Sequence, residues 1–335
     1  MGQLRRNPIN GQWVIIGIDN TTGNPAEFKI EEHIVKQPRE NCAFCPGNES
    51  QTPQEILSYR LTGAGHNNNA WLTRVIPNLF PALQIEGELE KFGIGVYDRI
   101  NGVGAHEVII EHPDHQKQLT ELADEEIENV IRAYRERSVD LSGDKRLKYI
   151  LIFKNHGFLA GSSMEHSHSQ LIALPIVPKS VKEELAGAEE YLRYRDRCVF
   201  CDIIGQEIRE GVRLLDENRF FISFCPFFPR FPFEIWVLPK QHHADFRAIT
   251  KEEMTYFARL VRTTLVRVKK RLEDPSYNFM LHTQPLDEAS EEIYHWHLEI
   301  IPKLTEVAGF EWGTGFYVNP TSPEDAAQWL KEITV

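Results

Sequence analysis

The sequence of 335 residues has no excess of basic charge and no long uninterrupted apolar run. Thirty-seven basic side chains stand against 49 acidic ones, a formal net charge of −12, so no overall positive field favours nucleic acid or anionic lipid. The most apolar stretch, residues 220–239, is interrupted by Arg230, Glu234 and four prolines. Such a stretch is not expected to span a bilayer, and we predict neither a nucleic-acid partner nor a membrane partner.

The first 13 residues lack the apolar core of a signal peptide, so we expect a cytoplasmic protein. Cysteine is also scarce, with five in the chain. Four of them form two C-x-x-C pairs, a pattern that favours metal binding over disulfides in a reducing compartment. The fifth, Cys225, is predicted to be a small buried apolar residue.

The sequence also lacks a glycine-rich phosphate turn between a strand and a helix, which excludes the Rossmann and P-loop classes. Any phosphate-bearing ligand must therefore be bound by other local groups. Apolar residues make up 41% of the chain and charged residues 26%, an ordinary composition for a globular protein. The length corresponds to two domains at roughly 150 residues each.

One order of motifs occurs twice along the chain. A C-x-x-C pair is followed by an apolar strand that ends near a histidine, a charged helical stretch, another strand and an H-x-H motif. The strand-end histidines are His115 and His242, 127 residues apart (242 − 115 = 127), and the next histidines follow at similar separations (166 − 115 = 51; 295 − 242 = 53). We predict a duplicated unit, with one domain at 1–190 and the other at 191–335.

Each unit is predicted to combine β-strands with a covering helix. Residues 106–112, 147–154, 169–177 and 233–239 are apolar, β-branched and of strand length. Thr250 and Glu253 form a capping box that precedes apolar residues at helical spacing. The predicted class is α+β, with mostly antiparallel sheets covered by helices.

The duplicated cysteines and histidines predict zinc sites, because a C-x-x-C turn supplies two thiolates and two histidines complete a tetrahedron. The candidate ligands of the first site are Cys42, Cys45, His115 and His166. Those of the second are Cys198, Cys201, His242 and His295. Ordinary surface or core roles are expected for His33, His66, His156, His243 and His282.

The segment from His166 to Gln170 is predicted to lie on a strand, so His166, His168 and Gln170 share a face. The small residues before it can surround a phosphate with backbone N–H groups and hydroxyls. A neutral imidazole whose other nitrogen is held can attack phosphorus, which makes His168 a candidate nucleophile; the alternative is a role in a hydrogen-bonded network around the metal. In the second unit Glu299 replaces Gln170 and would repel phosphate, so we expect one active centre, in the first unit.

These residues resemble the histidine triad superfamily, and specifically its galactose-1-phosphate uridylyltransferase branch. The resemblance covers nearly the whole chain and is carried by the segments NPINGQWVII, CAFCPGNE, VIPNLFPAL, NHGFLAGSSMEHSHSQ and GFEWGTGFYVNPTSPEDAA. It implies two histidine-triad-like units, the zinc site at Cys42, Cys45, His115 and His166, and a second zinc similar to that of the plant-type ADP-glucose phosphorylases.

The resemblance also implies residue roles. His168 matches the nucleophile that accepts a nucleoside monophosphate, and Gln170 and Ser163 match residues that hold the phosphate oxygens. Asn155 and Gly161 match positions that orient the loop, which also contains Ser162. Asn78, Phe80 and Pro81 fall on the segment that lines the nucleotide pocket.

The sequence departs from the family pattern at several positions. Asn20 and Asn24 stand where two arginines are expected. Leu79 replaces an acidic residue, and Thr314-Gly315 replaces a sugar-contacting Tyr-Glu pair. Ser167 replaces a proline, a change shared with phosphorylases and bacterial relatives. The first three departures bear on which base and sugar are bound.

The leading prediction is transfer of a uridylyl group from UDP-glucose to galactose 1-phosphate through His168. A nucleotide sugar and a hexose 1-phosphate are the expected partners, and a homodimer is expected because the family forms dimers. The first alternative is ADP-glucose phosphorylase, in which inorganic phosphate resolves the same intermediate. The second is a zinc-stabilised nucleotide-binding module without catalytic activity.

Overall fold

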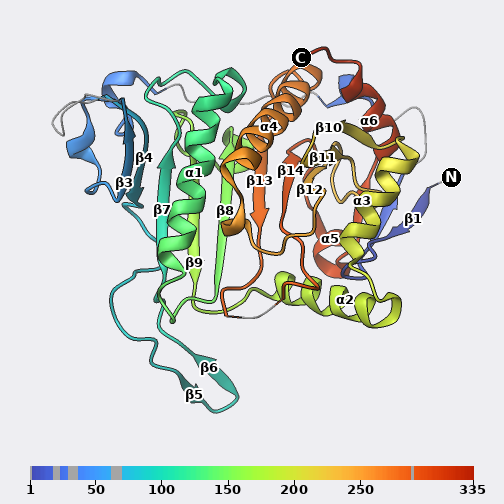
Figure 1. Cartoon of the computed structure of the whole chain (residues 1–335), viewed down its shortest axis with the longest axis horizontal. Helices are drawn as coiled ribbons and strands as arrows, with labels where there is room; N and C mark the ends of the chain where they lie inside the picture. Colours follow the sequence, from blue (N-terminus) through green and yellow to red (C-terminus); the bar gives the residue numbers. More distant parts are fainter. Residues whose placement is uncertain (1, 18–22, 29–36, 62–69, 288–289) are drawn as a thin grey trace.

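A computed structural model describes residues 2–17, 23–28, 37–61, 70–287 and 290–335 (Figure 1). Its centre is a ten-stranded sheet in which all neighbouring strands are antiparallel. In spatial order the strands are β10 (Leu214–Glu217), β11 (Phe221–Phe224), β12 (Ile235–Pro239), β14 (His297–Pro302), β13 (Tyr277–His282), β8 (Tyr149–His156), β9 (His168–Leu174), β7 (Ala105–Ile110), β4 (Trp71–Pro77) and β3 (Leu57–Arg60).

The two halves of this sheet have the same strand order. Reading outward from the middle, the strands are β8-β9-β7-β4-β3 in one half and β13-β14-β12-β11-β10 in the other. In both halves the last strand along the sequence lies between the fourth and the third. The halves meet at β8 and β13, which pair from Tyr277 opposite His156 to Leu281 opposite Ile152. The α+β class with an antiparallel sheet is confirmed, whereas the domain boundary at 190/191, which falls inside a helix, stays a prediction.

Two long helices, α1 (Asp124–Leu141) and α4 (Lys251–Arg271), cover one face of the sheet (Figure 1). The predicted capping box begins α4: Thr250 Oγ1 accepts from the Glu253 backbone N–H at 3.2 Å, and Glu253 Oε2 accepts from the Thr250 N–H at 2.8 Å. The apolar stripe of α4 is buried against the sheet and α1, as the helical spacing predicted. Its buried members include Met254, Phe257, Leu260, Val261 and Leu265.

The predicted strands are present, with one difference at the H-x-H motif. β9 begins at His168, so His166 precedes the strand rather than lying on it. Within β9, His168 and Gln170 point to the same face of the sheet. Their cross-strand partners on β7, Ile110 and Val108, point to this face as well. This face is turned away from α1 and α4, because Ile109 and Leu171, on the other face, belong to the core beneath those helices.

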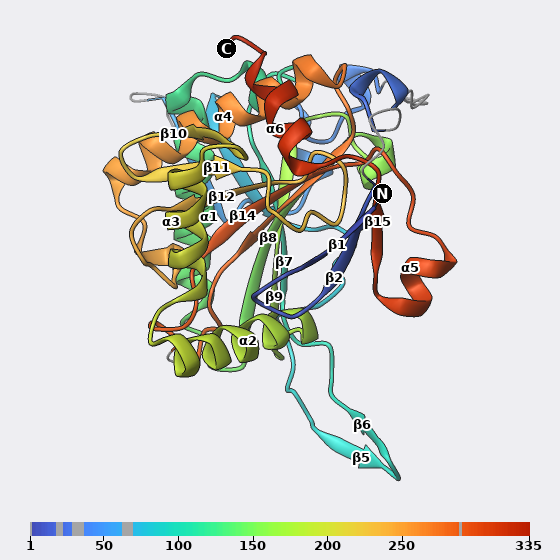
Figure 2. The ribbon, with the colours of Figure 1, turned by 90° about the vertical axis from the view of Figure 1, so that its right-hand side faces the viewer.

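The remaining elements lie around the sheet: α6 packs against α4 and β10, whereas α3 packs on the other face, over β11 and β12 (Figure 2). The N- and C-terminal segments lie side by side in a three-stranded sheet, next to which α5 projects. These strands are β1 (Gln3–Arg6), β2 (Trp13–Ile16) and β15 (Tyr317–Asn319), and the remaining helices are α2 (Lys179–Arg195), α3 (Val199–Glu210), α5 (Gly309–Thr314) and α6 (Pro323–Lys331). None of the described helices combines the length and the apolar content that crossing a bilayer requires.

Short elements complete the fold. A hairpin of β5 (Phe92–Ile94) and β6 (Tyr97–Arg99) extends away from the body (Figure 2). Its apolar side chains are exposed, Val96 to 91% and Tyr97 to 73%. The 3-10 helices are η1 (Pro25–Glu27), η2 (Arg39–Asn41), η3 (Glu49–Gln51), η4 (Leu119–Glu121), η5 (Phe158–Ala160) and η6 (Phe246–Ala248).

Candidate active site

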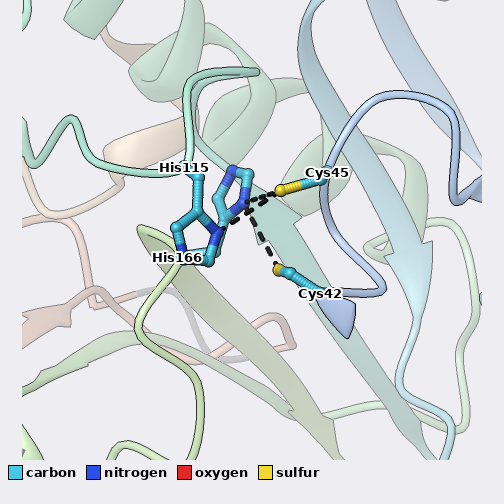
Figure 3. A group of neighbouring side chains, drawn as sticks. All are labelled: Cys42, Cys45, His115 and His166. Atoms are coloured by element: carbon cyan, nitrogen blue, oxygen red, sulfur yellow. Dashed lines mark hydrogen bonds between the residues drawn. The ribbon is translucent and has the colours of Figure 1, made fainter. Parts of the chain in front are cut away.

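The first cysteine–histidine group is assembled from three separate segments (Figure 3). Cys42 and Cys45 come from the turn after η2, His115 follows β7, and His166 precedes β9. Cys45 Sγ lies 3.3 Å from His115 Nδ1 and 3.6 Å from His166 Nδ1, and Cys42 Sγ lies 3.6 Å from His166 Nδ1. All four residues are buried.

The geometry of this group fits zinc. Zn–S bonds of ~2.3 Å and Zn–N bonds of ~2.0 Å in a tetrahedron place sulfur and nitrogen about 3.5 Å apart, as they are here. His166 Nε2–H donates to the His112 carbonyl at 2.7 Å, which leaves the Nδ1 lone pair facing the sulfurs. Burial and the adjacent Cys42 raise the pKa of the Cys45 thiol to about 12, so a pair of thiolates at this position requires a cation.

The second group repeats this arrangement in the other half of the sheet. Cys198 precedes α3 and Cys201 lies in its first turn, while His242 and His295 lie beyond β12 and before β14. Cys201 Sγ lies 3.3 Å from His242 Nδ1 and 3.8 Å from His295 Nδ1. His295 Nε2–H donates to the Pro239 carbonyl at 2.8 Å, the counterpart of the His166 bond. Both predicted ligand sets therefore come together.

His168 is oriented by the residue that precedes it in the H-x-H motif. Its Nδ1–H donates to the His166 carbonyl at 2.8 Å, and within the described residues its Nε2 has no hydrogen-bond partner. The Phe44 ring packs edge-on with its centroid 5.4 Å from the imidazole. Burial, and then the nearby charge of Lys154, lower the pKa of His168 to about 4, so the ring is neutral near pH 7 with its lone pair on Nε2.

A buried network of charged and hydroxyl groups holds the start of β9. Lys154 Nζ donates to Glu111 Oε2 at 2.7 Å, to Ser167 Oγ at 3.0 Å and to the His168 carbonyl at 3.0 Å. Ser169 Oγ donates to the second Glu111 oxygen at 2.7 Å. Burial alone would raise the pKa of Glu111. Lys154 and the hydroxyls of Ser167 and Ser169, which both donate to this carboxylate, lower it instead, so Glu111 stays ionised.

The loop between β8 and β9 is shaped by two glycines with positive φ. Gly157 (φ +80°) approaches Ser276 so closely that a Cβ would lie 2.0 Å from its Oγ, and Gly161 adopts φ +87°. Asn278 Nδ2 donates to Asn155 Oδ1 at 2.8 Å and to the Ala160 carbonyl at 2.9 Å. The amide nitrogen of Asn155 therefore faces Gly161, which brings these two predicted residues together.

The two serines of the loop are placed differently. Ser162 Oγ donates to the Met164 carbonyl at 2.8 Å, which closes the end of the loop. Ser163 is exposed and has no side-chain hydrogen bond within the described residues. Its hydroxyl is therefore available to a ligand, whereas that of Ser162 is already used.

The predicted nucleotide segment directly follows β4 and lies beside β7, where the Asn78 backbone N–H donates to the His106 carbonyl at 2.8 Å. Asn78 Oδ1 accepts from the Phe80 backbone N–H at 2.9 Å, and Phe80 is 85% exposed. His106 on β7 links this segment to Gln170, with Nε2 2.8 Å from Gln170 Oε1 and 3.1 Å from Asn78 Nδ2. Sequence analysis missed His106, although strand alternation from Val108, opposite Gln170, places it on the same face.

Comparison with known proteins agrees with this geometry. Residues 1–178 match the model of the family described as galactose-1-phosphate uridyl transferase, N-terminal domain. The chain belongs to this family. Residues 101–333 also match a model described as a domain of unknown function, DUF4921.

Similar proteins of this uridylyltransferase family span the full chain. The sequence is 36% identical to an ADP-glucose phosphorylase of Arabidopsis thaliana over 99% of this chain and 93% of that protein. It is 27% identical to a galactose-1-phosphate uridylyltransferase of Thermotoga maritima over 100% of this chain and 99% of that protein. A solved structure of an A. thaliana ADP-glucose phosphorylase with bound ADP-glucose aligns with a TM-score of 0.82 at 34% identity, covering both chains fully. The family member described here is therefore a nucleotidyl-transferring enzyme.

The departures from the uridylyltransferase family pattern have local structural roles. The Asn24 side chain accepts from the Ala26 backbone N–H at 3.1 Å and caps η1, whereas Asn20 lies outside the described residues. Thr314 Oγ1 donates to the Phe310 carbonyl at 2.7 Å, and Gly315 ends α5 with φ +72°. Leu79 is exposed beside Phe80. The bond that caps η1 and the bond at the end of α5 therefore involve no residue of β7, β8 or β9.

The second half of this family member contains a counterpart of His168 in a closed environment. His297 Nδ1–H donates to the His295 carbonyl at 3.0 Å, as His168 does to His166, but its Nε2 is buried without a partner among the described residues. The ring is stacked on His282 with centroids 4.8 Å apart, and Glu299 is paired with Arg230. Glu184, His282 and His297 bring ligand atoms within 4.8 Å of one another, a group that sequence analysis did not predict.

Proposed function

We propose that this enzyme moves a nucleoside monophosphate from a nucleotide sugar to a second phosphate through a covalent bond to His168. The observation that carries the proposal is the hydrogen bond from His168 Nδ1–H to the His166 carbonyl, which leaves the Nε2 lone pair free. The carbonyl also stabilises the positive charge that develops on the ring when Nε2 bonds to phosphorus. Because His166 belongs to the first cysteine–histidine group, a metal bound there fixes the position of this carbonyl.

The first step forms one bond and breaks one. The His168 Nε2 lone pair bonds to the α-phosphorus of the nucleotide sugar, and the bond from phosphorus to the bridging oxygen breaks. That oxygen leaves with its electron pair as part of hexose 1-phosphate. Gln170 and Ser163 are proposed to donate to the phosphate oxygens, and Asn155, Gly161 and Ser162 to hold the loop around them.

In the second step a phosphate oxygen of the acceptor attacks phosphorus and the lone pair returns to Nε2. With UDP-glucose as donor and galactose 1-phosphate as acceptor, the product is UDP-galactose, the leading candidate function. Inorganic phosphate as acceptor and ADP-glucose as donor give ADP. The 36% identity to an ADP-glucose phosphorylase over nearly the whole chain favours this second candidate specifically. Asn78 and Phe80 are proposed to contact the nucleotide in either case.

A labelled-substrate chase tests the proposal. The enzyme is mixed with UDP-glucose or ADP-glucose carrying 32P at the α-phosphorus, and acid-labile label bound to protein is measured. Adding galactose 1-phosphate or inorganic phosphate then identifies the acceptor from the labelled product. Absence of any protein-bound label with either donor would leave the third alternative, a nucleotide-binding module without catalytic activity.

Two zinc ions per chain and a homodimer are part of the proposal. The S–N distances in both cysteine–histidine groups support zinc. The exposed apolar side chains of the β5–β6 hairpin support a contact with a second copy of the chain. Sedimentation equilibrium tests the dimer, with a shift toward monomer expected for Val96→Asp. Cell fractionation tests the expected cytoplasmic location.

A further inference from the structure

His106 occupies a position between the nucleotide segment and the catalytic strand. Its Nδ1 lies 3.1 Å from the Ala82 backbone N–H, and its Nε2 lies 2.8 Å from Gln170 Oε1. Gln170 follows His168 by two residues on the same face of β9. One imidazole thus contacts two parts of the site that are far apart in sequence.

These contacts determine where the proton of His106 resides. A backbone N–H can only donate, so Nδ1 is the acceptor and the ring proton is on Nε2. The Nε2–H group must then donate to its neighbour on Gln170, which identifies that atom as the carbonyl oxygen Oε1. A flipped Gln170 amide would place two donors 2.8 Å apart.

The same reasoning orients Asn78. The Phe80 backbone N–H donates to Asn78 Oδ1, so the atom 3.1 Å from His106 Nε2 is the amide nitrogen. Because Nε2 already carries a proton, this approach is a contact and not a hydrogen bond. The N–H groups of Asn78 therefore have no acceptor on His106 and are left for a ligand.

We propose that His106 is a positioning residue that holds Gln170 with its amide N–H groups toward the phosphate attacked by His168. The inference rests on the proposed function and deepens it. The two ends of a glutamine amide have nearly the same size, so packing alone does not select between them. If the amide turned around, Oε1 would face the anionic phosphate and repel it. His106 selects the orientation that donates.

Three single variants separate the two contacts of His106. His106→Phe removes both, His106→Asn keeps an acceptor near the Nδ1 position, and His106→Gln keeps a donor near the Nε2 position. The measurement is the first-turnover rate of protein labelling by α-32P nucleotide sugar under rapid quench. We expect His106→Phe and His106→Asn to lower this rate about 10- to 100-fold, the size of one lost hydrogen bond to a charged group. His106→Gln should restore most of it.

A double-mutant cycle with Gln170→Ala distinguishes positioning from general structural support. If His106 acts through Gln170, His106→Phe has little further effect on labelling when residue 170 is alanine. An equal loss in both backgrounds, or failure of His106→Gln to exceed His106→Asn, would overturn the role. If the unsubstituted enzyme is not labelled at all, the proposed function fails first and this inference falls with it. Labelling of the unsubstituted enzyme followed by additive losses rejects the His106 role alone.

Discussion

The Nζ atom of Lys154 lies 3.0 Å from the carbonyl oxygen of His168, so a buried cation on β8 holds the strand that presents the imidazole. The same ammonium group is paired with Glu111, and both side chains are essentially inaccessible to solvent. An ion pair in this position stabilises the fold only while both partners are present.

Lys154→Met should therefore destabilise the enzyme strongly, because it leaves the Glu111 carboxylate buried without a cation. We expect a loss of about 3–5 kcal/mol in the free energy of unfolding, measured by urea titration. Lys179→Met is the matched control, since Lys179 is exposed and should change stability by less than ~0.5 kcal/mol. Removing both charges in Lys154→Met/Glu111→Leu should recover part of the loss; a double variant as unstable as the single one would contradict this account.

The same pair predicts a dependence of stability on pH. The pKa of Glu111 is lower in the folded chain than in the unfolded chain, so its contribution is full above the ordinary carboxyl range and is lost as pH falls through the folded pKa. Urea unfolding between pH 7 and pH 3 should therefore show a steeper decline for the unsubstituted enzyme than for Lys154→Met/Glu111→Leu. Parallel declines would show that the carboxylate gains no net stabilisation from its partners.

Each cysteine–histidine group should hold one metal ion independently. Cys42→Ser and Cys198→Ser should each lower the zinc content, measured by plasma mass spectrometry, from two ions per chain to one. Each should also lower the thermal unfolding temperature, because metal binding contributes to folding. Cys225→Ala is the control, since Cys225 is buried and belongs to neither group. Unchanged zinc content in Cys198→Ser would remove the second site.

His168 and His297 provide a matched pair for the nucleophile. His168→Gln should abolish covalent labelling by the nucleotide sugar while the protein remains folded by circular dichroism. His297→Gln changes the equivalent position of the other half, where Nε2 is buried, and should label within about threefold of the unsubstituted rate despite a lower unfolding temperature. Labelling that survives in His168→Gln and disappears in His297→Gln would reverse the assignment.

The loop between β8 and β9 should not tolerate a side chain at position 157. Gly157→Ala combines a positive φ with a clash against Ser276, and we expect about 3 kcal/mol or more of lost stability and weaker substrate binding. Gly211→Ala also has a positive φ but meets open space, so it should cost only roughly 1–2 kcal/mol. Equal effects on unfolding would mean that the contact with Ser276 is unimportant.

Much of the fold and both ligand sets were predictable because the repeated motif order is a local property of the sequence. Strand-length apolar segments predicted the antiparallel sheet, and the spacing of Cys42, Cys45, His115 and His166 predicted a group that the structure brings together. The start of β9 was less predictable. His166 faces the cysteines from a turn, and its contacts rather than strand alternation set its direction.

The residues that sequence analysis missed make their contacts with residues far away in the sequence, so these contacts depend on how the strands pair. Lys154 was read as part of an apolar strand, and its partner Glu111 is 43 residues away at the end of another strand. His106 gains its role only because Gln170 lies across the strand pair and Ala82 folds back over it. The local sequence around these residues does not show which distant residue each one contacts, because that depends on how the strands pair.

The bond from Asn278 to Asn155 crosses the seam between the two halves of the sheet. Asn278 lies on β13, yet it shapes the loop that precedes His168 in the other half. The half that contains the buried His297 thus supports the loop that precedes His168 in the other half. In the proposed reaction, one half of the sheet carries the nucleophile, and a residue of the other half holds the loop that surrounds the phosphate.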